Sequence, residues 1–407
     1  MREISVDQVK VGDIVAEPVY DDKKQRFLPR GIKLNSALIS RLKDRGVPSL
    51  VIEGEDPDEV IENVAELLED LEHRFEALAG DAVMMRIKEI ARCHLIPGAE
   101  PAAEIVVDEA EFGVDEEKPE PQSTSDQERL RNRVENATNL PSLPDVVFRI
   151  NEMVGDPGTS SRQVGAEIAR DQVLSAKVLK LVNSGLYGFS RSITTISHAV
   201  TMLGFDAVKS LVLGSSVLDL MSGAIPGLWE HSQACARTCG LIANHLEMPD
   251  PEEIATIGLL HDLGKVVLQK TLEAEYKQVF LRVKKADMLF YKAEEDRRVL
   301  GAGINHGTIG GWLLAKWTLP EKLVEPIMYH HNFHPDLEYS ERTALVHLAD
   351  VLCRAEAFGN GGDRKIPRLQ AQILDTLDMN MDDVEKIMGQ MHESLRDIPR
   401  VKPGLDQ

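Results

Sequence analysis

The sequence predicts a mainly α-helical chain, in which a small β-rich module and a long helix precede an all-α domain. Apolar residues recur at helical spacing through most of residues 129–401, without a convincing strand pattern. The first 55 residues instead combine short alternating runs with turn-forming residues. At 407 residues, 43% of them hydrophobic, the chain is long enough for two or three domains that each bury a core.

Residues 1–55 have the pattern of short strands joined by turns. Apolar and polar residues alternate over Ile4–Val19, and Arg26–Leu28 and Pro48–Ile52 are further strand-like segments. Between them, Asn35 or Ser36 is placed to cap a short helix. We therefore predict a small β-rich N-terminal module.

Residues 56–96 are predicted to form a connecting helix. An apolar stripe at three- and four-residue steps runs along it, formed by Val60, Val64, Leu67, Leu68, Leu71, Phe75 and Leu78. Such a stripe either packs on the helix's own domain or forms the interface of a homodimer. The sequence leaves both alternatives open.

Residues 97–128 form an acidic segment with four prolines and little periodicity. Residues 99–128 hold 11 acidic side chains and one basic side chain, which gives −10 of the chain's net charge of −21. We expect a flexible, self-repelling linker that proteases cut first. A nucleic-acid-binding protein normally shows a basic face, so the charge argues against a nucleic-acid partner.

Composition also points to a cytoplasmic protein without a membrane segment. No apolar run approaches the roughly 18 residues that span a bilayer, and the first ten residues lack an apolar stretch of signal-peptide type. Four cysteines without framework spacing indicate a reducing compartment. Cys235 and Cys239 lie one helical turn apart, and we interpret them as two small buried residues rather than a thiol pair.

Residues 129–401 carry histidines and aspartates in five separate segments. Imidazole and carboxylate groups suit a divalent transition metal, or a metal pair that activates water for phosphoester hydrolysis. Taken singly, each residue is more often a capping or core side chain; five segments of the right type together favour a site. The candidate metal ligands are His231, His261, Asp262, His306, His330, His331 and Asp350.

These ligands should converge in one pocket lined by several helices. The adjacent His261 and Asp262 would lie on one buried helix and supply a nitrogen and an oxygen ligand. We expect Asp350 and the histidine pair His330–His331 within about 10 Å of Asp262, and His306 at or near the rim.

The motifs around these residues resemble the HD superfamily of metal-dependent phosphohydrolases. The matching segments are "GLLHDLGK", "HGTIGGWLLAKWTLP", "YHH" and "LADVL". On this resemblance the seven candidates match metal-ligand positions for iron, manganese, zinc or magnesium. Lys265 matches a substrate-contacting lysine, a catalytic role that applies only if the domain is active, and a nucleotide ligand is then implied.

Upstream segments narrow the resemblance to the HD-related output domain, or HDOD, over nearly all of residues 139–401. They include "LPDV", "ARDQVLSAKVLKLVNSGLYG" and "ITTISHAVTMLG". That family is thought to relay signals through protein contacts, usually without demonstrated catalysis. The N-terminal "VDQVKVGDIVAEPVYD" looks like the short domain found ahead of HD-type phosphodiesterases.

Two departures bear on activity. The cyclic-di-GMP phosphodiesterases of the superfamily follow their histidine pair with an acid and a Gly-Tyr-Pro turn, whereas here Asn332–Tyr339 follows without that turn. They also place a glutamate one turn before the first histidine, where this chain has Gly227. We therefore expect a signalling output protein that binds signalling proteins, and at most one metal ion, rather than an enzyme. The alternatives are a metal-dependent phosphohydrolase and a helical scaffold.

Overall fold

The structure is a computed structural model that describes residues 2–96 and 124–400 with gaps, and Ala99 between them. The longer gaps are residues 10–14, 21–25, 53–56, 138–144 and 184–192, and residues 401–407 also lie outside the described part. Most of the predicted acidic linker therefore falls outside it. The helix α4 begins at Thr124, within the last residues assigned to that linker.

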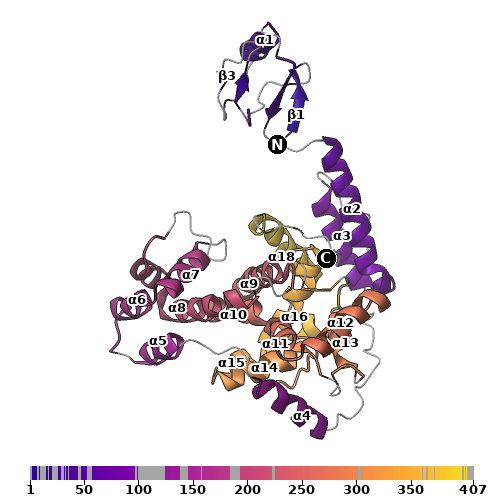
Figure 1. Cartoon of the computed structure of the whole chain (residues 1–407). Helices are drawn as coiled ribbons and strands as arrows, with labels where there is room; N and C mark the ends of the chain where they lie inside the picture. The colour runs from indigo at the N-terminus through magenta and orange to yellow at the C-terminus, as the bar shows by residue number, and fades with distance from the viewer. Residues whose placement is uncertain are drawn as a thin grey trace. The chain divides into compact units, whose positions relative to one another are not determined.

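The chain is mainly α-helical, as the sequence predicts, and divides into two compact units, Met1–Glu69 and Asp70–Gln407. Figure 1 shows the elements, coloured along the chain. Their bounds are β1 Arg2–Ser5, β2 Val19–Tyr20, β3 Arg26–Leu28, α1 Ser36–Asp44, β4 Ser49–Ile52, α2 Pro57–Phe75, the 3₁₀ helix η2 Glu76–Leu78, α3 Ala82–Leu95, α4 Thr124–Glu135, α5 Asp145–Gly155, α6 Ser161–Ala169, α7 Gln172–Val182, α8 Ile196–Met221, α9 Leu228–His245, α10 Pro251–Leu260, α11 Leu263–Thr271, α12 Glu273–Ala286, α13 Phe290–Glu295, α14 His306–Lys316, α15 Glu321–Tyr329, α16 Ser340–Ala355, α17 Gln372–Thr376 and α18 Met381–Ser394.

The first unit contains two antiparallel strand pairs. β1 pairs with β4, with Arg2 opposite Ile52 and Ser5 opposite Ser49, and β2 pairs with β3. The core of the unit is apolar and includes Val15, Leu34 and Leu42. Burial of these aliphatic side chains stabilises the two short strand pairs, since an isolated pair of strands has only marginal stability in water.

The single connecting helix predicted for residues 56–96 is wrong, because the structure has two helices there. α2 ends at Phe75, η2 follows, and α3 begins after Asp81, whose side chain accepts a hydrogen bond from the Met84 amide at 3.0 Å. An aspartate in this position satisfies a free amide at a helix start. Ala79 and Gly80 lie in the turn between the helices.

The last turn of α2 and all of α3 belong to the second unit, so the boundary between the units falls within α2 and not at residue 55. The Arg74 guanidinium donates to the main-chain oxygens of Arg354 and Ala355. Arg86 pairs with Glu385 at 2.7 Å, and Arg368 with Asp81 at 2.6 Å. Residues 70–95 are therefore part of the helical unit, although they precede the linker predicted at residues 97–128.

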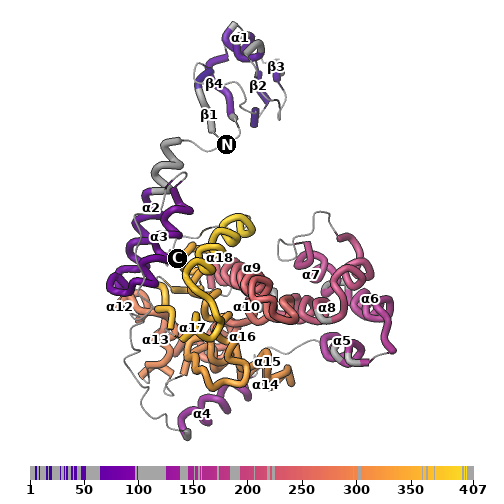
Figure 2. Tube along the Cα trace, turned by 180° about the vertical axis from the view of Figure 1, so that it is seen from behind, coloured from indigo at the N-terminus to yellow at the C-terminus, as the bar shows by residue number. Residues whose placement is uncertain are grey.

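The helical unit has two halves. α5–α8 pack mainly on one another, and α9–α18 form the other half, on which α3 and α4 also pack. α9 and α10 lie between α8 and the helices α11, α14 and α16 (Figures 1 and 2). α8 bends sharply at Gly204, whose φ of +80° and ψ of −180° are not helical. That bend separates the two apolar stretches seen in the sequence on either side of Gly204.

No single helix in the described part of the chain is both long and apolar enough to cross a membrane. The two arms of α8, bent by 119°, meet the length and composition requirement only when taken together.

Candidate metal centre

The candidate ligands come from helix starts, from a helix end, from one helix break and, for Asp350, from the interior of α16. Gly227, with φ of +76°, precedes α9, and its carbonyl accepts from the His231 amide in the first turn of that helix. His261 and Asp262 lie between α10 and α11. The prediction that they lie on one helix is therefore wrong. Because Gly227 lies in the left-handed region ahead of α9, a glutamate would be strained there.

A close approach of two helices brings His306 to Asp262. A Cβ atom added to Gly264 of α11 would lie 1.9 Å from the main-chain oxygen of His306, the first residue of α14. Only glycine allows this contact between backbones. The segment "HDLGK" thus provides both the ligand pair and the small residue that lets a second helix reach it.

All seven side chains lie in one buried cluster. Asp350 is 1% exposed, His331 is 5% exposed, and the other five are fully buried. The prediction that His306 lies at the rim is wrong, because its ring is enclosed between Asp262, Glu294 and His331. The other predicted ligands converge as expected, and two groups of four side chains each lie close enough to surround an ion.

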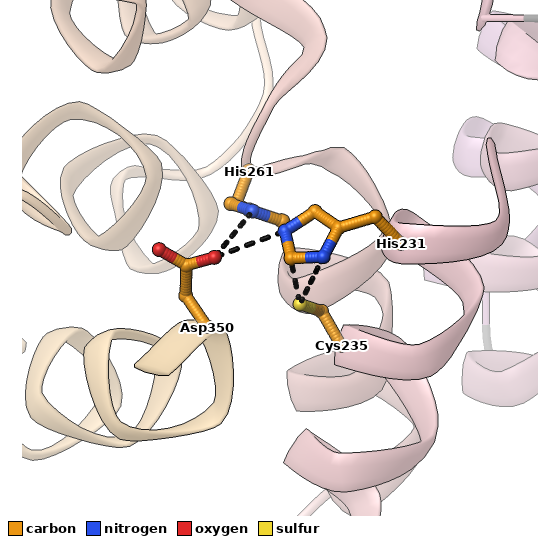
Figure 3. A group of neighbouring side chains, drawn as sticks. All are labelled: His231, Cys235, His261 and Asp350. Carbon is orange, nitrogen blue, oxygen red and sulfur yellow. Dashed lines mark hydrogen bonds and ion pairs between the residues drawn. The ribbon is translucent and has the colours of Figure 1, made fainter. Parts of the chain in front are cut away.

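The first group, here the His231 group, is His231, Cys235, His261 and Asp350 (Figure 3). The Nε2 atom of His231 lies 2.9 Å from Asp350 Oδ1, and the Nε2 atom of His261 lies 3.7 Å from the same oxygen. The Cys235 sulfur lies 3.6 Å from His231 Nε2. Residues from α9, the α10–α11 break and α16 thus meet at one point.

The second group, here the His306 group, is Asp262, His306, His330 and His331. The Nε2 atom of His306 lies 2.9 Å from Asp262 Oδ1 and 3.0 Å from His331 Nε2. The two groups adjoin, since Asp262 Oδ2 lies 3.5 Å from His261 Nε2 and 3.8 Å from His231 Nε2.

Hydrogen bonds orient three of the imidazole rings. The Nδ1 atom of His261 lies 2.7 Å from the Gly258 oxygen, and that of His330 lies 2.7 Å from the Ile327 oxygen. The Nδ1 atom of His306 lies 2.6 Å from Glu294 Oε2. Each partner is an acceptor, so Nδ1 carries a proton, and on His261 and His330 a neutral ring then directs its Nε2 lone pair into the cluster. Metal-binding histidines are held in this way.

Buried polar atoms without a hydrogen-bond partner also fit an ion. Among the described residues these include His261 Nε2, His330 Nε2 and Asp350 Oδ2. Buried polar atoms normally find a partner, and a lost partner costs about 1–3 kcal/mol. Nitrogen and carboxylate donors are the ligands that a divalent transition metal takes. The residues present therefore fit the metal that the sequence motifs imply.

Two buried cations also reach the carboxylates. Lys265 Nζ lies 2.9 Å from Asp262 Oδ2, 2.7 Å from the Gly361 oxygen and 3.5 Å from Asp363 Oδ2. The Lys265 side chain is fully buried and its contacts are internal, unlike a lysine that faces a substrate. Arg354 Nε lies 2.7 Å from Asp350 Oδ1, and its Nη1 lies 2.5 Å from Asp363 Oδ2.

The segment after α16 covers the cluster. Here we call residues 359–363 the glycine segment, of which the structure describes Gly359, Gly361, Gly362 and Asp363. A Cβ atom on Gly361 would lie 2.8 Å from Asp262 Oδ2, 3.1 Å from Lys265 Nζ and 3.2 Å from His231 Cδ2. Gly359 and Gly362 have φ of +69° and +95°, which favour glycine. The main chain thus lies directly against the ligands.

The charges set the protonation of the cluster. Burial opposes ionisation of Asp262 and Asp350, but Lys265 and Arg354 outweigh it and hold both pKa values well below their usual range. Burial alone would lower the pKa of His306, but Glu294 and Asp262 raise it to about 9. Burial lowers the pKa values of His330 and His331.

Sequence reasoning missed four residues of this cluster: Cys235, Glu294, Arg354 and Asp363. Arg354 had a readable signal, because it follows Asp350 by four residues on one helix and such a pair shares a face. Glu294 and Asp363 meet the cluster only through the fold. Cys235 also follows His231 by four residues, but the burial preference of cysteine favoured the interpretation as packing.

Comparison with known proteins gives the family of this region. Residues 140–333 match the HDOD domain family. The chain contains an HDOD domain. The match ends at Phe333, so Asp350, Arg354 and the glycine segment lie beyond it, although they complete the same cluster.

Solved structures share the fold of the HDOD domain and its surroundings. An HDOD domain protein of unknown function from Geobacter sulfurreducens is 26% identical, with a TM-score of 0.56 over 68% of this chain and 99% of that chain. A Shewanella amazonensis protein provisionally named a phosphohydrolase is 23% identical, with a TM-score of 0.52 over 65% of this chain and 95% of its own. A Marinobacter aquaeolei protein provisionally named a signal transduction protein is 20% identical, with a TM-score of 0.55 over 72% and 68%.

Two curated proteins, from Treponema pallidum and Bacillus subtilis, also match. The chain spans 42% and 32% of their lengths, at 25% and 30% identity.

Proposed function

We propose that this chain is a signal-transduction output protein whose HDOD domain acts through contacts with other signalling proteins. In this proposal the buried cluster holds one divalent metal ion, which ties α9, the α10–α11 break and α16 together and does not turn over a substrate. A relative of the same fold is provisionally named a signal transduction protein. The ion would be iron, manganese, zinc or magnesium.

The donor set supports the metal. When bound, the ion supplies a positive charge that neutral imidazoles and carboxylates satisfy together. The residues themselves do the rest: Gly258 and Ile327 fix two rings through their carbonyl oxygens, and Glu294 fixes a third. Arg354 holds Asp350 by one oxygen, and the other oxygen remains available.

One observation carries the non-catalytic part of the proposal: the Gly361 main chain and the Lys265 ammonium lie against the ligands. A phosphoester needs space beside the activated water and a cation that faces its oxygens. Here Lys265 is engaged by Asp262, Asp363 and a carbonyl, and the adjacent space is filled by backbone.

The test combines metal analysis with a hydrolysis panel on the full chain purified without chelators. We expect close to one equivalent of a divalent metal and no significant hydrolysis of cyclic-di-GMP or of simple nucleotides with added manganese or iron(II). The control is Asp262→Ala. Turnover by the wild-type protein that this variant loses would overturn the proposal and establish a phosphohydrolase.

That phosphohydrolase is the second candidate function. The specific observation in its favour is the set of inward-facing Nε2 atoms on His261, His306 and His330, whose Nδ1 atoms are all tied. In this alternative the glycine segment would have to move to admit a substrate. Hydrolysis in the panel, lost in Asp262→Ala, is the result that would favour it.

A further inference from the structure

Cys235 is the one member of the His231 group that the sequence motifs do not supply. It follows His231 by one turn of α9, is 1% exposed, and directs its sulfur toward His231, 3.6 Å from Nε2 and 4.0 Å from Nδ1 (Figure 3). Together with His261 and Asp350 it completes four donors, whose ligand atoms all lie within 4.8 Å of one another.

The neighbouring Cys239 shows that burial alone does not explain this position. It lies one turn further along α9 and is fully buried as well. Its sulfur packs against Gly258 of α10, where an added Cβ atom would lie 2.6 Å from it. Cys239 is not part of either four-residue group. The two cysteines share a helix and an environment of similar burial, but only Cys235 meets the histidines and the aspartate.

We propose that the Cys235 thiolate is the fourth protein ligand of the ion, alongside His231, His261 and Asp350. This inference rests on the proposed metal binding and deepens it, because it assigns the ion to the His231 group and selects its chemical class. A thiolate favours zinc(II) or another thiophilic transition ion over magnesium, which prefers oxygen donors. On binding, the thiol loses one proton to solvent as the sulfur–metal bond forms.

The distances suit a tetrahedral ion. Metal bonds of about 2.0–2.3 Å place neighbouring ligand atoms roughly 3.3–3.8 Å apart. Two separations in the His231 group lie in this range, 3.6 Å from His231 Nε2 to the sulfur and 3.7 Å from His261 Nε2 to Asp350 Oδ1. The third, 2.9 Å from His231 Nε2 to Asp350 Oδ1, is a hydrogen-bond distance that an ion would have to lengthen by a few tenths of an ångström.

Independent evidence for a ligand comes from the partners of Cys235. His261 Nε2 and Asp350 Oδ2 are buried without a hydrogen-bond partner among the described residues, and both belong to this group. The His306 group has such atoms as well, since His330 Nε2 and His331 Nδ1 are buried without a hydrogen-bond partner among the described residues. Each group also has a basic side chain on its carboxylate, Lys265 on Asp262 and Arg354 on Asp350. The sulfur donor is what distinguishes the His231 group.

The test is cobalt(II) substitution of the full chain, followed by absorption spectroscopy. Cobalt(II) replaces zinc(II) in such sites, and a thiolate ligand gives it a charge-transfer band in the near ultraviolet. We expect the wild-type protein to show this band at one equivalent of cobalt. Cys235→Ser and Cys235→Ala should lose it and bind zinc(II) at least about 10-fold more weakly, since even changes outside the ligand set cost 10–100-fold.

Cys239→Ser is the matched control, and it should keep both the band and the affinity. His330→Ala removes a donor of the His306 group only, and it therefore tests which of the two groups holds the ion. Circular dichroism and thermal unfolding of each metal-free variant distinguish misfolding from loss of a ligand. The use of two Cys235 variants keeps the test valid if one of them fails to fold.

The outcomes separate the two proposals. If the wild-type protein binds one ion without a thiolate band, and the Cys235 variants bind equally well, the assignment of Cys235 is overturned while the metal proposal stands. If His330→Ala abolishes binding and Cys235→Ala does not, the ion belongs to the His306 group. If the wild-type protein binds no divalent ion at all, both proposals fail.

Discussion

The two halves of the helical unit bury different chemistry. The half formed by α5–α8 has an aliphatic core, with Ile168, Val178, Val212 and Val217 fully buried. The half that follows buries ionisable side chains to the same degree, among them Asp262, Lys265 and His306. Both halves bury aliphatic side chains, such as Val266 and Leu345 in the second, but the second half adds a buried charged cluster to them.

The difference predicts which half responds to solution conditions. Burial of aliphatic surface contributes stability that does not depend on pH or on metal ions. A buried charged cluster is stable only while its charges are balanced, and removal of one partner leaves another charge uncompensated. We expect pH and metal to act on the second half and core truncations to act equally on both.

The largest effect should come from Asp350→Ala. This change removes the carboxylate that faces Arg354, His231 and His261, and leaves the buried guanidinium with less countercharge. We expect the free energy of unfolding, measured by urea denaturation of metal-free protein, to fall by about 3–5 kcal/mol.

A surface ion pair supplies the control for that measurement. Lys277 and Glu273 lie 2.7 Å apart but are 69% and 71% exposed, so Lys277→Ala should change stability by no more than about 0.5 kcal/mol. Equal losses in the two variants would show that the buried cluster has no special energetic role.

The next effect concerns pH. His306 has a pKa of about 9 in the folded chain, against about 6.5 for an ordinary histidine. Its proton therefore stabilises the metal-free fold fully below about pH 6.5, and this contribution is lost as pH rises through 9. We expect a decrease of roughly 3 kcal/mol in the free energy of unfolding between these two values.

Glu294→Gln tests the cause, because it keeps the shape of the side chain and removes the charge that raises the pKa of His306. The variant should be less stable near pH 6.5 and should lose most of the pH dependence above it. His330 and His331, with lowered pKa values, act below pH 6.5 and in the opposite direction. An unchanged profile in the variant would refute this account.

The smallest effect should come from the aliphatic half. Ile168 of α6 is fully buried, and Ile168→Val removes one methylene from its core. We expect a loss of about 1 kcal/mol, the same at pH 6.5 and pH 9, with metal content unchanged. A pH-dependent loss, or loss of metal, would mean that the two halves are coupled more closely than their cores suggest.

Much of this fold was predictable from sequence. Helical periodicity predicted the helical character of residues 129–401, and Ser36 begins α1 where a helix start was predicted. The hairpin of α2 and α3 was missed, because the apolar stripe continues from Phe75 to Leu78 while the chain turns at Ala79 and Gly80. The packing of Arg74 against α16 depends on Arg354, which lies 280 positions away, and no local pattern reports such a contact.

The seven ligand-type residues were found because two signals coincided, residue type and motif order. The burial of His306 was not predicted. It depends on the close contact of α11 with α14 at Gly264, and a single glycine in a sequence does not show which segment packs against it. Arg354 and Asp363 add one positive and one negative side chain to the cluster and so change its charge balance. Motif matching by itself does not weigh that balance.

Under the proposed metal binding, the glycine segment would also set how fast the ion exchanges. With the Gly361 main chain against Asp262 and His231, and with Lys265 fully buried, an ion would reach the cluster through local opening of the chain. Such openings are rare in well-packed regions and have their own free energy. Exchange would then follow the lifetime of the closed chain and not the rate of diffusion, so purified protein would carry the ion that was available when it folded, however long it is later dialysed.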